Sequence, residues 1–296
     1  MIYIVIAVHD RLAATLECLA CIAEQTYTAY QVVLVDDGST DGTADAVMRK
    51  YPNTKIITGD GNLWWTGAMA KGIEYILPEA AANDYVLSLN NDVTFQPDYL
   101  QSLVNTSQQR QNAVVGSLCR DVLPPHEVFD AGITMRWYKY VYGQLTYNDQ
   151  IAVADQIDTI SGRGVLIPVS VIQQIGNFDY RYLPHYGADY EYGFRVKRAN
   201  IPMVVDYHAV VYLKNELTGF RPTAEVLSYR DQWRRLFSIK SPANVIVHLK
   251  LIWRYCPKWT TKCFDLAYVI LGNAYIAARS TLLYTLQLCH LRKSSS

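Results

Sequence analysis

Residues 31–50 read QVVLVDDGSTDGTADAVMRK, and this stretch predicts a buried strand, a polar turn and a helix in direct succession. A similar unit precedes it, because the apolar run Ile2–Val8 is followed by helical spacing of leucine and isoleucine over residues 11–25. Continuous apolar runs of this length are typical of parallel strands buried on both faces. The first fifty residues therefore predict two strand–helix units of an α/β sheet.

Strand and helix patterns keep alternating as far as residue 118. The further predicted strands are Lys55–Thr58, Tyr85–Leu89 and Ala113–Leu118, and the further helices are Trp65–Leu77 and Pro97–Gln109. This order predicts an open, mostly parallel sheet with helices on both faces. The alternation then breaks, and the aromatic, β-prone residues 128–147 predict an antiparallel addition or an ordered loop.

The second half predicts shorter elements and then a helical tail. Its predicted strands are Val165–Ile167, Met203–Val205 and Ala209–Leu213, and its helices end at Ile175, span Asp189–Ala199 and follow Thr223. With 296 residues, 50% of them hydrophobic, the chain is long enough for one large α/β domain with an appendage. We expect these parts to cover residues 1–222 and 223–296.

Composition and cysteine spacing exclude several classes of protein. A chain that is 50% hydrophobic and 18% charged is neither disordered nor a disulfide-stapled miniprotein. Cys18 and Cys21 form a C-x-x-C pair inside a helical pattern, which predicts core thiols in a reducing compartment rather than a redox or zinc site. The first ten residues lack the basic region and cleavage pattern of a secretory signal.

Polar residues follow the predicted strands at the edge where open parallel sheets bind ligands. The first such segment is Ala7–Arg11, and the second contains Asp36 and Asp37, whose carboxylates can accept hydrogen bonds from a base or a ribose. We expect Asp41, a few residues later, to cap the next helix. Neither a G-x-G-x-x-G nor a P-loop pattern occurs, which argues against a classical dinucleotide fold.

Two further acidic segments admit two interpretations each. Asn90-Asn91-Asp92 ends the fourth predicted strand and suits either a hard divalent cation such as Mg²⁺ or Mn²⁺ or an ordinary polar turn. Asp189 and Glu191 begin a predicted helix, where they suit either a general base with a polar anchor or simple capping.

Taken in order, these segments resemble the bacterial family 2 glycosyltransferases, which are inverting enzymes with the GT-A fold. The matching motifs are VDDGSTDGT, GNLWWTGAMAKGI, LNNDV, SGRGVLIP and YGADYEYGFRVKRAN, and the later SYRDQWRRLFSIK is similar to a basic helix in rhamnosyltransferase-like members. The resemblance covers roughly residues 1–240 and implies a GT-A sheet with a C-terminal helical appendage.

The resemblance also implies a role for each candidate residue. Asp189 would be the catalytic base, Glu191 would orient a substrate, and Asp92 would bind the divalent cation (Mg²⁺ or Mn²⁺) that bridges the donor's phosphates. The residues expected to bind the nucleotide-sugar are Val8, Asp10, Asp36, Asp37, Asn62, Trp65, Asn90, Asn91 and Arg163.

The chain departs from the family pattern at three positions. Asn90 stands where the D-x-D begins, and Ala188 stands where an acid usually precedes the base. His208 is displaced from the position of a family histidine that helps hold the metal or diphosphate, and Lys214 is an alternative cation for a phosphate. These departures leave metal affinity to Asp92 alone.

We therefore expect a transferase that moves a sugar from a nucleotide-diphosphate sugar to a hydroxyl of a glycan or lipid-linked glycan in cell-surface polysaccharide synthesis. A catalytically inactive GT-A scaffold in a polysaccharide assembly complex is the alternative, kept open by Asn90 and Ala188. A sugar-nucleotide nucleotidyltransferase is disfavoured because Ala7–Arg11 contains no glycine. We expect no nucleic-acid partner.

The tail is basic and aromatic. Residues 230–293 contain eleven Lys and Arg against two acids, a net charge of +9 in a chain whose total is zero. Its longest run without charge, Leu266–Ala278, is thirteen residues, shorter than the roughly 20 of a spanning helix. We expect an interfacial helix interrupted at Pro257 and a cytoplasmic, peripheral location on the inner face of the membrane. Packing on the catalytic domain or a homodimer is the alternative.

Overall fold

The computed structural model describes residues 1–213 and 228–294. The chain divides into two compact units, one comprising Met1–Met135 and Tyr142–Leu217 and the other Arg136–Val141 and Thr218–Ser296. The expected boundary between residues 222 and 223 lies outside the described residues, as does Lys214.

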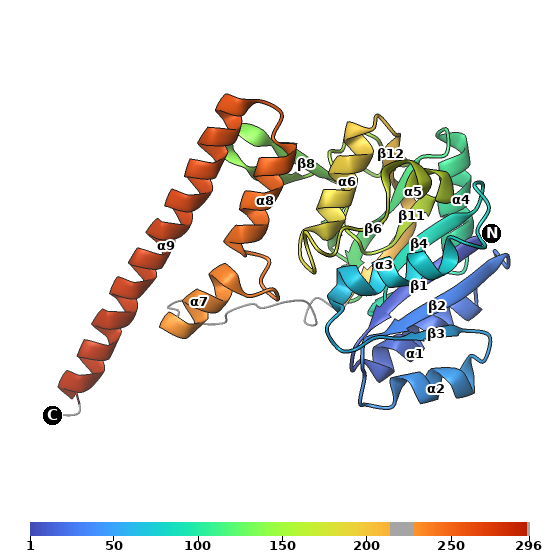
Figure 1. The fold of residues 1–296 in the computed structure, drawn as a ribbon, viewed down its shortest axis with the longest axis horizontal. Helices are drawn as coiled ribbons and strands as arrows, with labels where there is room; N and C mark the ends of the chain where they lie inside the picture. Colours follow the sequence, from blue (N-terminus) through green and yellow to red (C-terminus); the bar gives the residue numbers. More distant parts are fainter. Residues whose placement is uncertain (214–227, 295–296) are drawn as a thin grey trace. The chain divides into compact units, whose positions relative to one another are not determined.

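The first unit is built on a ten-stranded, mostly parallel sheet with the order β10-β12-β6-β11-β4-β1-β2-β3, where β5 pairs with β12 and β7 with β6 (Figure 1). Its strands are β1 (Ile2–Val8), β2 (Tyr30–Asp36), β3 (Lys55–Thr58), β4 (Tyr85–Asn90), β5 (Val93–Thr94), β6 (Val114–Asp121), β7 (Val128–Asp130), β10 (Val153–Ala154), β11 (Val165–Pro168) and β12 (Met203–Leu213). The central strand β1 is parallel to β2 and β4, while β11 is antiparallel to β4 and β6.

Helices cover both faces of this sheet. On one face lie α1 (Leu12–Ala23), α2 (Thr43–Lys50) and α4 (Tyr99–Gln109), and on the other lie α3 (Trp64–Ile76), α5 (Val169–Ile175) and α6 (Ala188–Arg198) (Figure 1). Strand β1 feeds both cores, because Ile4 and Ile6 pack on the first face and Tyr3 and Val5 on the second. Each fully buried aliphatic side chain of this kind contributes roughly 1.5–3 kcal/mol. The predicted α/β architecture is confirmed.

The irregular region after β6 contains the predicted antiparallel addition. Strand β7 pairs antiparallel with β6, and β8 (Ile133–Arg136) and β9 (Val141–Gln144) form a separate two-stranded sheet.

One strand prediction was wrong. Met203–Val205 and Ala209–Leu213 belong to a single strand, β12, with a register shift between Asp206 and Val210. The polar residues between the two apolar runs look like a turn in the sequence. In the structure the buried carboxylate of Asp206 accepts hydrogen bonds from the hydroxyls of Ser102 (2.7 Å) and Thr106 (2.8 Å) on α4, so the strand continues past it.

The second unit is helical. It contains the 3₁₀ turn η1 (Trp137–Lys139) and the helices α7 (Tyr229–Phe237), α8 (Val245–Tyr255) and α9 (Trp259–Ser294), which are labelled in Figure 1. Tyr138, the central residue of η1, stacks on Phe264 of α9, with ring centroids 4.4 Å apart. Pro257 lies between α8 and α9, as expected of a helix-breaking residue.

Helix α9 corrects the expectation that no segment is long enough to cross a membrane. Its residues Trp259–Leu286 form a 28-residue stretch that contains an 18-residue window with mean hydropathy 1.3, of which 6% is buried, and this is the one such candidate among the described residues. The run of thirteen uncharged residues underestimated the segment, because isolated charges do not interrupt the helix. This finding concerns the length and composition of α9.

Gly72 tests the packing of α3 on the sheet. A Cβ at this position would lie 2.5 Å from Cγ1 of Val5 and 3.1 Å from Cγ2 of Val35. We expect Gly72→Ala to lower the free energy of unfolding by about 1–3 kcal/mol in urea denaturation, because overpacking outweighs alanine's better helix propensity. Gly272→Ala in α9, where a Cβ meets nothing within 4 Å, is the matched control and should be neutral or stabilising. Equal effects of the two changes would contradict close packing of α3 on β1.

Candidate functional site

The carboxyl ends of three parallel strands bring the predicted segments together. Val8 of β1 is paired in register with Asp36 of β2, and Ala7 is paired with Asn90 of β4. The backbone oxygen of Val8 also accepts a hydrogen bond from the N–H of Asp37 at 2.9 Å. The sheet therefore places the first three polar segments along one edge, as the sequence predicted.

The Asn90–Asp92 segment sends its three side chains in different directions. The amide oxygen of Asn90 accepts a hydrogen bond from Trp65 Nε1 at 3.0 Å. Asn91 is buried, and its Nδ2 donates to the hydroxyl of Thr15 on α1 at 3.0 Å. Asp92 Oδ2 lies 3.3 Å from Nη1 of Arg11. Asn91 thus ties the strand end to α1, while Asn90 and Asp92 face two different parts of the site.

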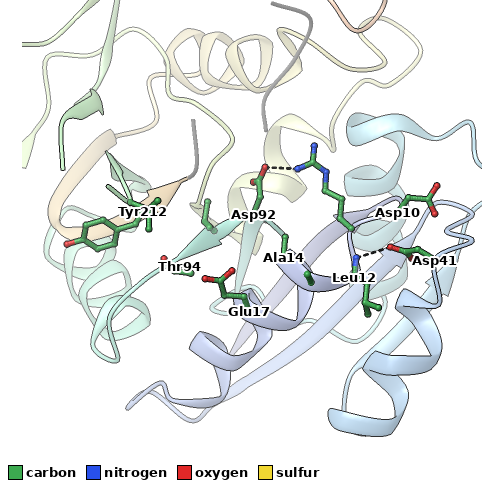
Figure 2. A pocket seen from close by; sticks show the side chains of 12 residues that line it. Asp10, Leu12, Ala14, Glu17, Asp41, Asp92, Thr94 and Tyr212 are labelled. Carbon is green, nitrogen blue, oxygen red and sulfur yellow. Dashed lines mark hydrogen bonds and ion pairs between the residues drawn. The ribbon is translucent and has the colours of Figure 1, made fainter. Parts of the chain in front are cut away.

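A cavity of about 710 Å³ opens beside Asp92 (Figure 2). It is lined by Asp10, Arg11, Leu12, Ala13, Ala14, Glu17, Asp41, Asp92, Val93, Thr94, Val122 and Tyr212. Figure 2 shows Asp10 and Asp41 at one side of this cavity and Tyr212 at the other, with Asp92 between them.

Of the predicted site residues, only Asp10 and Asp92 line this cavity. Arg11 could have been predicted as a site residue, because it is the last residue of the polar segment after β1. Glu17 and Tyr212 also line the cavity, but the sequence around them gives no sign of a site.

Asp36 and Asp37 are buried and order the loops at the edge. Asp37 Oδ1 accepts a hydrogen bond from the N–H of Gly61 at 2.8 Å, and its Oδ2 accepts one from the N–H of Trp64 at 3.0 Å. Asp36 Oδ1 accepts one from the N–H of Ser39 at 2.8 Å. These carboxylates hold the loop that leads into α3 and so set the position of its first residues.

The turn after β2 is braced by two more acids. Asp10 has a positive φ of 50°, and its Oδ1 accepts a hydrogen bond from the N–H of Thr40 at 2.7 Å. The N-cap of α2 is Gly42 and not Asp41 as predicted, because Asp41 lies one residue earlier, but its carboxylate still accepts hydrogen bonds from the N–H of Thr43 at 3.1 Å and of Leu12, the first residue of α1, at 2.9 Å. Asn62 is exposed, and its own N–H donates to Asp60 at 2.9 Å.

Trp65 joins this edge to Asp189. A Cβ at Gly162 would lie 2.8 Å from Cζ2 of Trp65 and 3.2 Å from Cβ of Asp189, so glycine allows the indole and the carboxylate residue to approach. Asp189 Oδ2 accepts a hydrogen bond from the N–H of Gly162, and its Oδ1 accepts one from the N–H of Tyr190, both at 2.9 Å. Trp65, Asn90 and Asp189 thus form one connected group.

The electrostatics favour a carboxylate that binds protons more readily than usual. Burial raises the pKa of Asp189, although the N–H groups of Gly162 and Tyr190 and the charge of Arg163 oppose the shift. Burial also disfavours the Arg163 cation, but nearby Cys119, Asp189 and Asp130 more than offset this and raise its pKa. Arg163 is therefore placed among negative groups next to Asp189.

Asp130 is one of the negative residues near Arg163, and it was not among the site residues predicted from the sequence. It ends β7, it is buried, and its Oδ1 accepts a hydrogen bond from the N–H of Gly132 at 2.9 Å. Burial raises its pKa, and Arg163 partly opposes that shift. The β-prone residues 128–147 did predict an antiparallel addition, but nothing in the local sequence predicts that Asp130 is buried near Arg163.

Glu191 faces a different neighbour from Asp189. It is 1% exposed, and its Oε2 accepts a hydrogen bond from Nε of Arg195 at 3.0 Å. Arg195 Nη1 in turn donates to the backbone oxygen of Ile175 at 2.9 Å, which links α6 to the end of α5. These contacts are those of a structural ion pair.

The acidic residues present fit a divalent cation only in a limited way. Among the described residues there is no group of three or more His, Cys, Asp or Glu side chains that could hold a metal. His208 is exposed beside Asp206, with 71% of its side chain accessible. Asp92 is the one predicted carboxylate on the cavity wall next to β4, so a cation there would draw most of its ligands from a bound phosphate group.

The sheet order, the polar strand ends and the adjoining cavity define a GT-A-type glycosyltransferase domain. Two solved structures are similar to the chain: GalNAc-T7 with UDP, GalNAc and Mn²⁺ (TM-score 0.58, 12% identity, 90% of this chain and 55% of that one) and TarS 1–349 of S. aureus (TM-score 0.55, 15% identity, 91% and 70%). At these identities the likeness supports the fold alone.

The family model described as Glycosyl transferase family 2 matches residues 3–176. The chain is also 25% identical over 234 residues to the N-acetylglucosaminyl-diphospho-decaprenol L-rhamnosyltransferase of Mycobacterium tuberculosis, covering 71% of this chain and 75% of that one. The chain therefore belongs to glycosyl transferase family 2, is rhamnosyltransferase-like, and is a glycosyltransferase.

A change at Glu191 separates its structural role from a catalytic one. Glu191→Ala leaves the Arg195 cation buried without its partner, which typically costs about 3–5 kcal/mol. We expect a correspondingly lower free energy of unfolding, with unchanged nucleotide affinity per folded molecule, measured by denaturation and calorimetry. The control Glu127→Ala removes a partly exposed carboxylate of the same unit and should have little effect. Normal stability with weakened substrate binding would instead support the anchor role implied by the resemblance.

Proposed function

We propose that this chain transfers a sugar from a nucleotide-diphosphate sugar to a hydroxyl of a lipid-linked glycan, with inversion at the anomeric carbon and with Asp189 as the general base. The connected group of Asp189, Trp65 and Asn90 carries the proposal, because it places a carboxylate of raised pKa next to the strand edge. The lipid-linked acceptor is inferred from the name of the Mycobacterium tuberculosis relative.

The donor's diphosphate is placed in the cavity beside Asp92 and Arg11. Arg11 supplies a guanidinium that can bind phosphate oxygens in a bidentate manner once it leaves Asp92. Asp92 would hold a divalent cation, which when bound neutralises charge on the departing diphosphate. The nucleoside would extend along the edge toward the loops that Asp36 and Asp37 order.

Asp189 acts on the acceptor. Two backbone N–H groups fix its carboxylate, so it can take the proton of an acceptor hydroxyl without reorienting. The hydroxyl oxygen then attacks the anomeric carbon as the bond to the diphosphate breaks on the opposite side. A single displacement inverts the configuration and needs no covalent carboxylate intermediate. Arg163, among Asp189 and Asp130, is suited to hold the acceptor or a phosphate oxygen.

Asp189→Asn is expected to reduce kcat by 10² to 10⁴ and to spare nucleotide binding, because the amide cannot accept a proton. In the wild type, log kcat/KM should fall with decreasing pH through a pKa above the usual value of an aspartate, since burial raises the pKa of Asp189 and only the ionised form is a base. This acidic limb should be absent from the residual activity of the variant. Stopped assays across pH and calorimetry with nucleotides measure these effects.

The control for this test is Asp155→Asn, which removes an exposed acid of the same unit and should leave both the rate and the pH profile unchanged. Thermal unfolding shows whether Asp189→Asn remains folded. A folded variant that keeps full activity would refute Asp189 as the base. Absence of turnover in the wild type as well would favour the inactive-scaffold alternative. Loss of nucleotide binding together with turnover would assign Asp189 to the donor instead.

Asp92 tests the proposed role of the cation without an activity assay. We expect Mn²⁺ to strengthen binding of UDP or dTDP to the wild type, and Asp92→Asn to reduce that gain at least about tenfold. Titration calorimetry with and without Mn²⁺ measures it. Glu17→Gln, on the wall of the same cavity, is the control and should keep the metal effect. An unchanged metal effect in Asp92→Asn would exclude Asp92 as the ligand.

A lipid-linked acceptor places the reaction at a membrane. We therefore propose a cytoplasmic enzyme that is peripheral on the inner face of the cell membrane and contacts it through the helical unit. Trp253, Trp259 and Lys262 support this placement, because the Lys262 ammonium lies 5.3 and 5.6 Å from the two indole rings, a grouping suited to a headgroup layer.

A further inference from the structure

Helix α7 carries an exposed aromatic stripe. Tyr229, Trp233 and Phe237 recur every four residues, so they share one face of the helix. They are 52%, 67% and 38% exposed, and the rings of Trp233 and Phe237 lie 4.4 Å apart. A contiguous, exposed aromatic face of this kind marks an interaction surface.

Arginines flank this stripe. Arg230 and Arg234 are exposed and Arg235 is half-buried, whereas the helix contains a single acid, Asp231. Asp231 also serves the helix start, because the N-cap Ser228 donates its hydroxyl proton to Oδ2 at 2.7 Å and accepts from the N–H of Asp231. The surface of α7 is therefore both aromatic and cationic, which complements anionic headgroups over acyl chains.

One side of α7, which includes Gln232 and the first residue of the stripe, packs on α9. The buried Gln232 accepts a hydrogen bond from the hydroxyl of Thr281 on α9 at 3.1 Å, and the Tyr229 hydroxyl lies 2.9 Å from that of Thr285. The same turns of α9 expose the side chains of Leu282, Leu283 and Leu286. Tyr229, the first residue of the stripe, therefore contacts α9, and its ring also lies 5.1 Å from that of Tyr284, whereas Trp233 and Phe237 remain exposed.

The packing of the helical unit argues that α9 lies along a membrane rather than across it. Near one end of α9, Phe264 stacks on Tyr138, which follows β8 directly in the chain, and near the other end α7 packs on Thr281 and Thr285. A crossing helix would place these contacts on opposite sides of the bilayer. The chain would then need a second span, and α8, with 11 residues, is shorter than the roughly 20 required.

We propose that α7 is a lipid-contacting element that inserts Trp233 and Phe237 between the headgroups of an anionic leaflet, while Arg230, Arg234 and Arg235 bind headgroup phosphates. Tyrosine and tryptophan favour this layer because their rings are apolar with one polar edge. The inference rests on the proposed function, because a lipid-linked acceptor requires the enzyme at a membrane. It adds the surface that brings the enzyme there.

The test is sedimentation of the full-length chain with vesicles of phosphatidylcholine alone or with 30% phosphatidylglycerol. We expect binding to the anionic vesicles, and at least a tenfold lower partition coefficient for the double variant Trp233→Ser, Phe237→Ser. Leu123→Ser, which changes a 64% exposed apolar residue of the α/β unit, is the matched control and should bind like the wild type. Arg234→Ala with Arg235→Ala should lower binding by roughly fivefold per charge and weaken its salt dependence.

The outcomes separate this inference from the proposed function. Vesicle binding that is equal in the wild type and the double variant, or absent from both, overturns the role of α7. The stripe could instead be covered by a second copy of the chain, and size-exclusion chromatography with light scattering tests this. A wild-type dimer that becomes a monomer in the double variant would identify the stripe as a contact between two copies and would overturn the lipid-contacting role. Calorimetry with UDP or dTDP should be unchanged in every α7 variant, and failure to bind any nucleotide would instead count against the proposed function.

Discussion

The indole of Trp65 is the contact on which the arrangement of the site depends. Its N–H donates to Asn90 at the end of β4, and its ring fills the space that Gly162 leaves beside Asp189. Strand β4 leads into Asp92 at the cavity, and α6 carries Asp189, which we propose as the base. Trp65 thus connects the end of β4 to Gly162, whose N–H binds Asp189, and under the proposed mechanism this connection would position the base relative to the donor, as an in-line displacement requires.

The sequence predicted most of the sheet because its strongest signal is local. Runs such as Ile2–Val8 are apolar without alternation, since both faces of a central parallel strand are buried, and Lys55–Thr58 has the bounds expected of it. Strand β12 was not predictable in the same way. The burial of Asp206 depends on two hydroxyls of α4 about one hundred residues earlier, and no local pattern reports such a contact.

For the site, residue type and position along the strand were predictable, but side-chain direction was not. Asn90, Asn91 and Asp92 look equivalent in the sequence, yet they contact Trp65, Thr15 and Arg11 respectively. The alternation of side chains at a strand end and the approach of α1 decide these directions. The four-residue spacing of Glu191 and Arg195 was a usable signal of an ion pair, which competes with any role of Glu191 at a substrate.

The tail illustrates how composition predicts a class of surface without locating it. The aromatic and basic residues around Trp259 belong to the first turns of α9. Those of α7 come earlier in the sequence, and α7 packs on α9 near Thr281. Trp259 and Thr281 are separated by 22 residues of one helix, or about 33 Å at 1.5 Å per residue. A single point of contact would leave α9 free to tilt. If both groups contact the membrane as proposed, these two points along one helix would hold its axis parallel to the leaflet and so limit how the helical unit presents itself to a lipid-linked substrate.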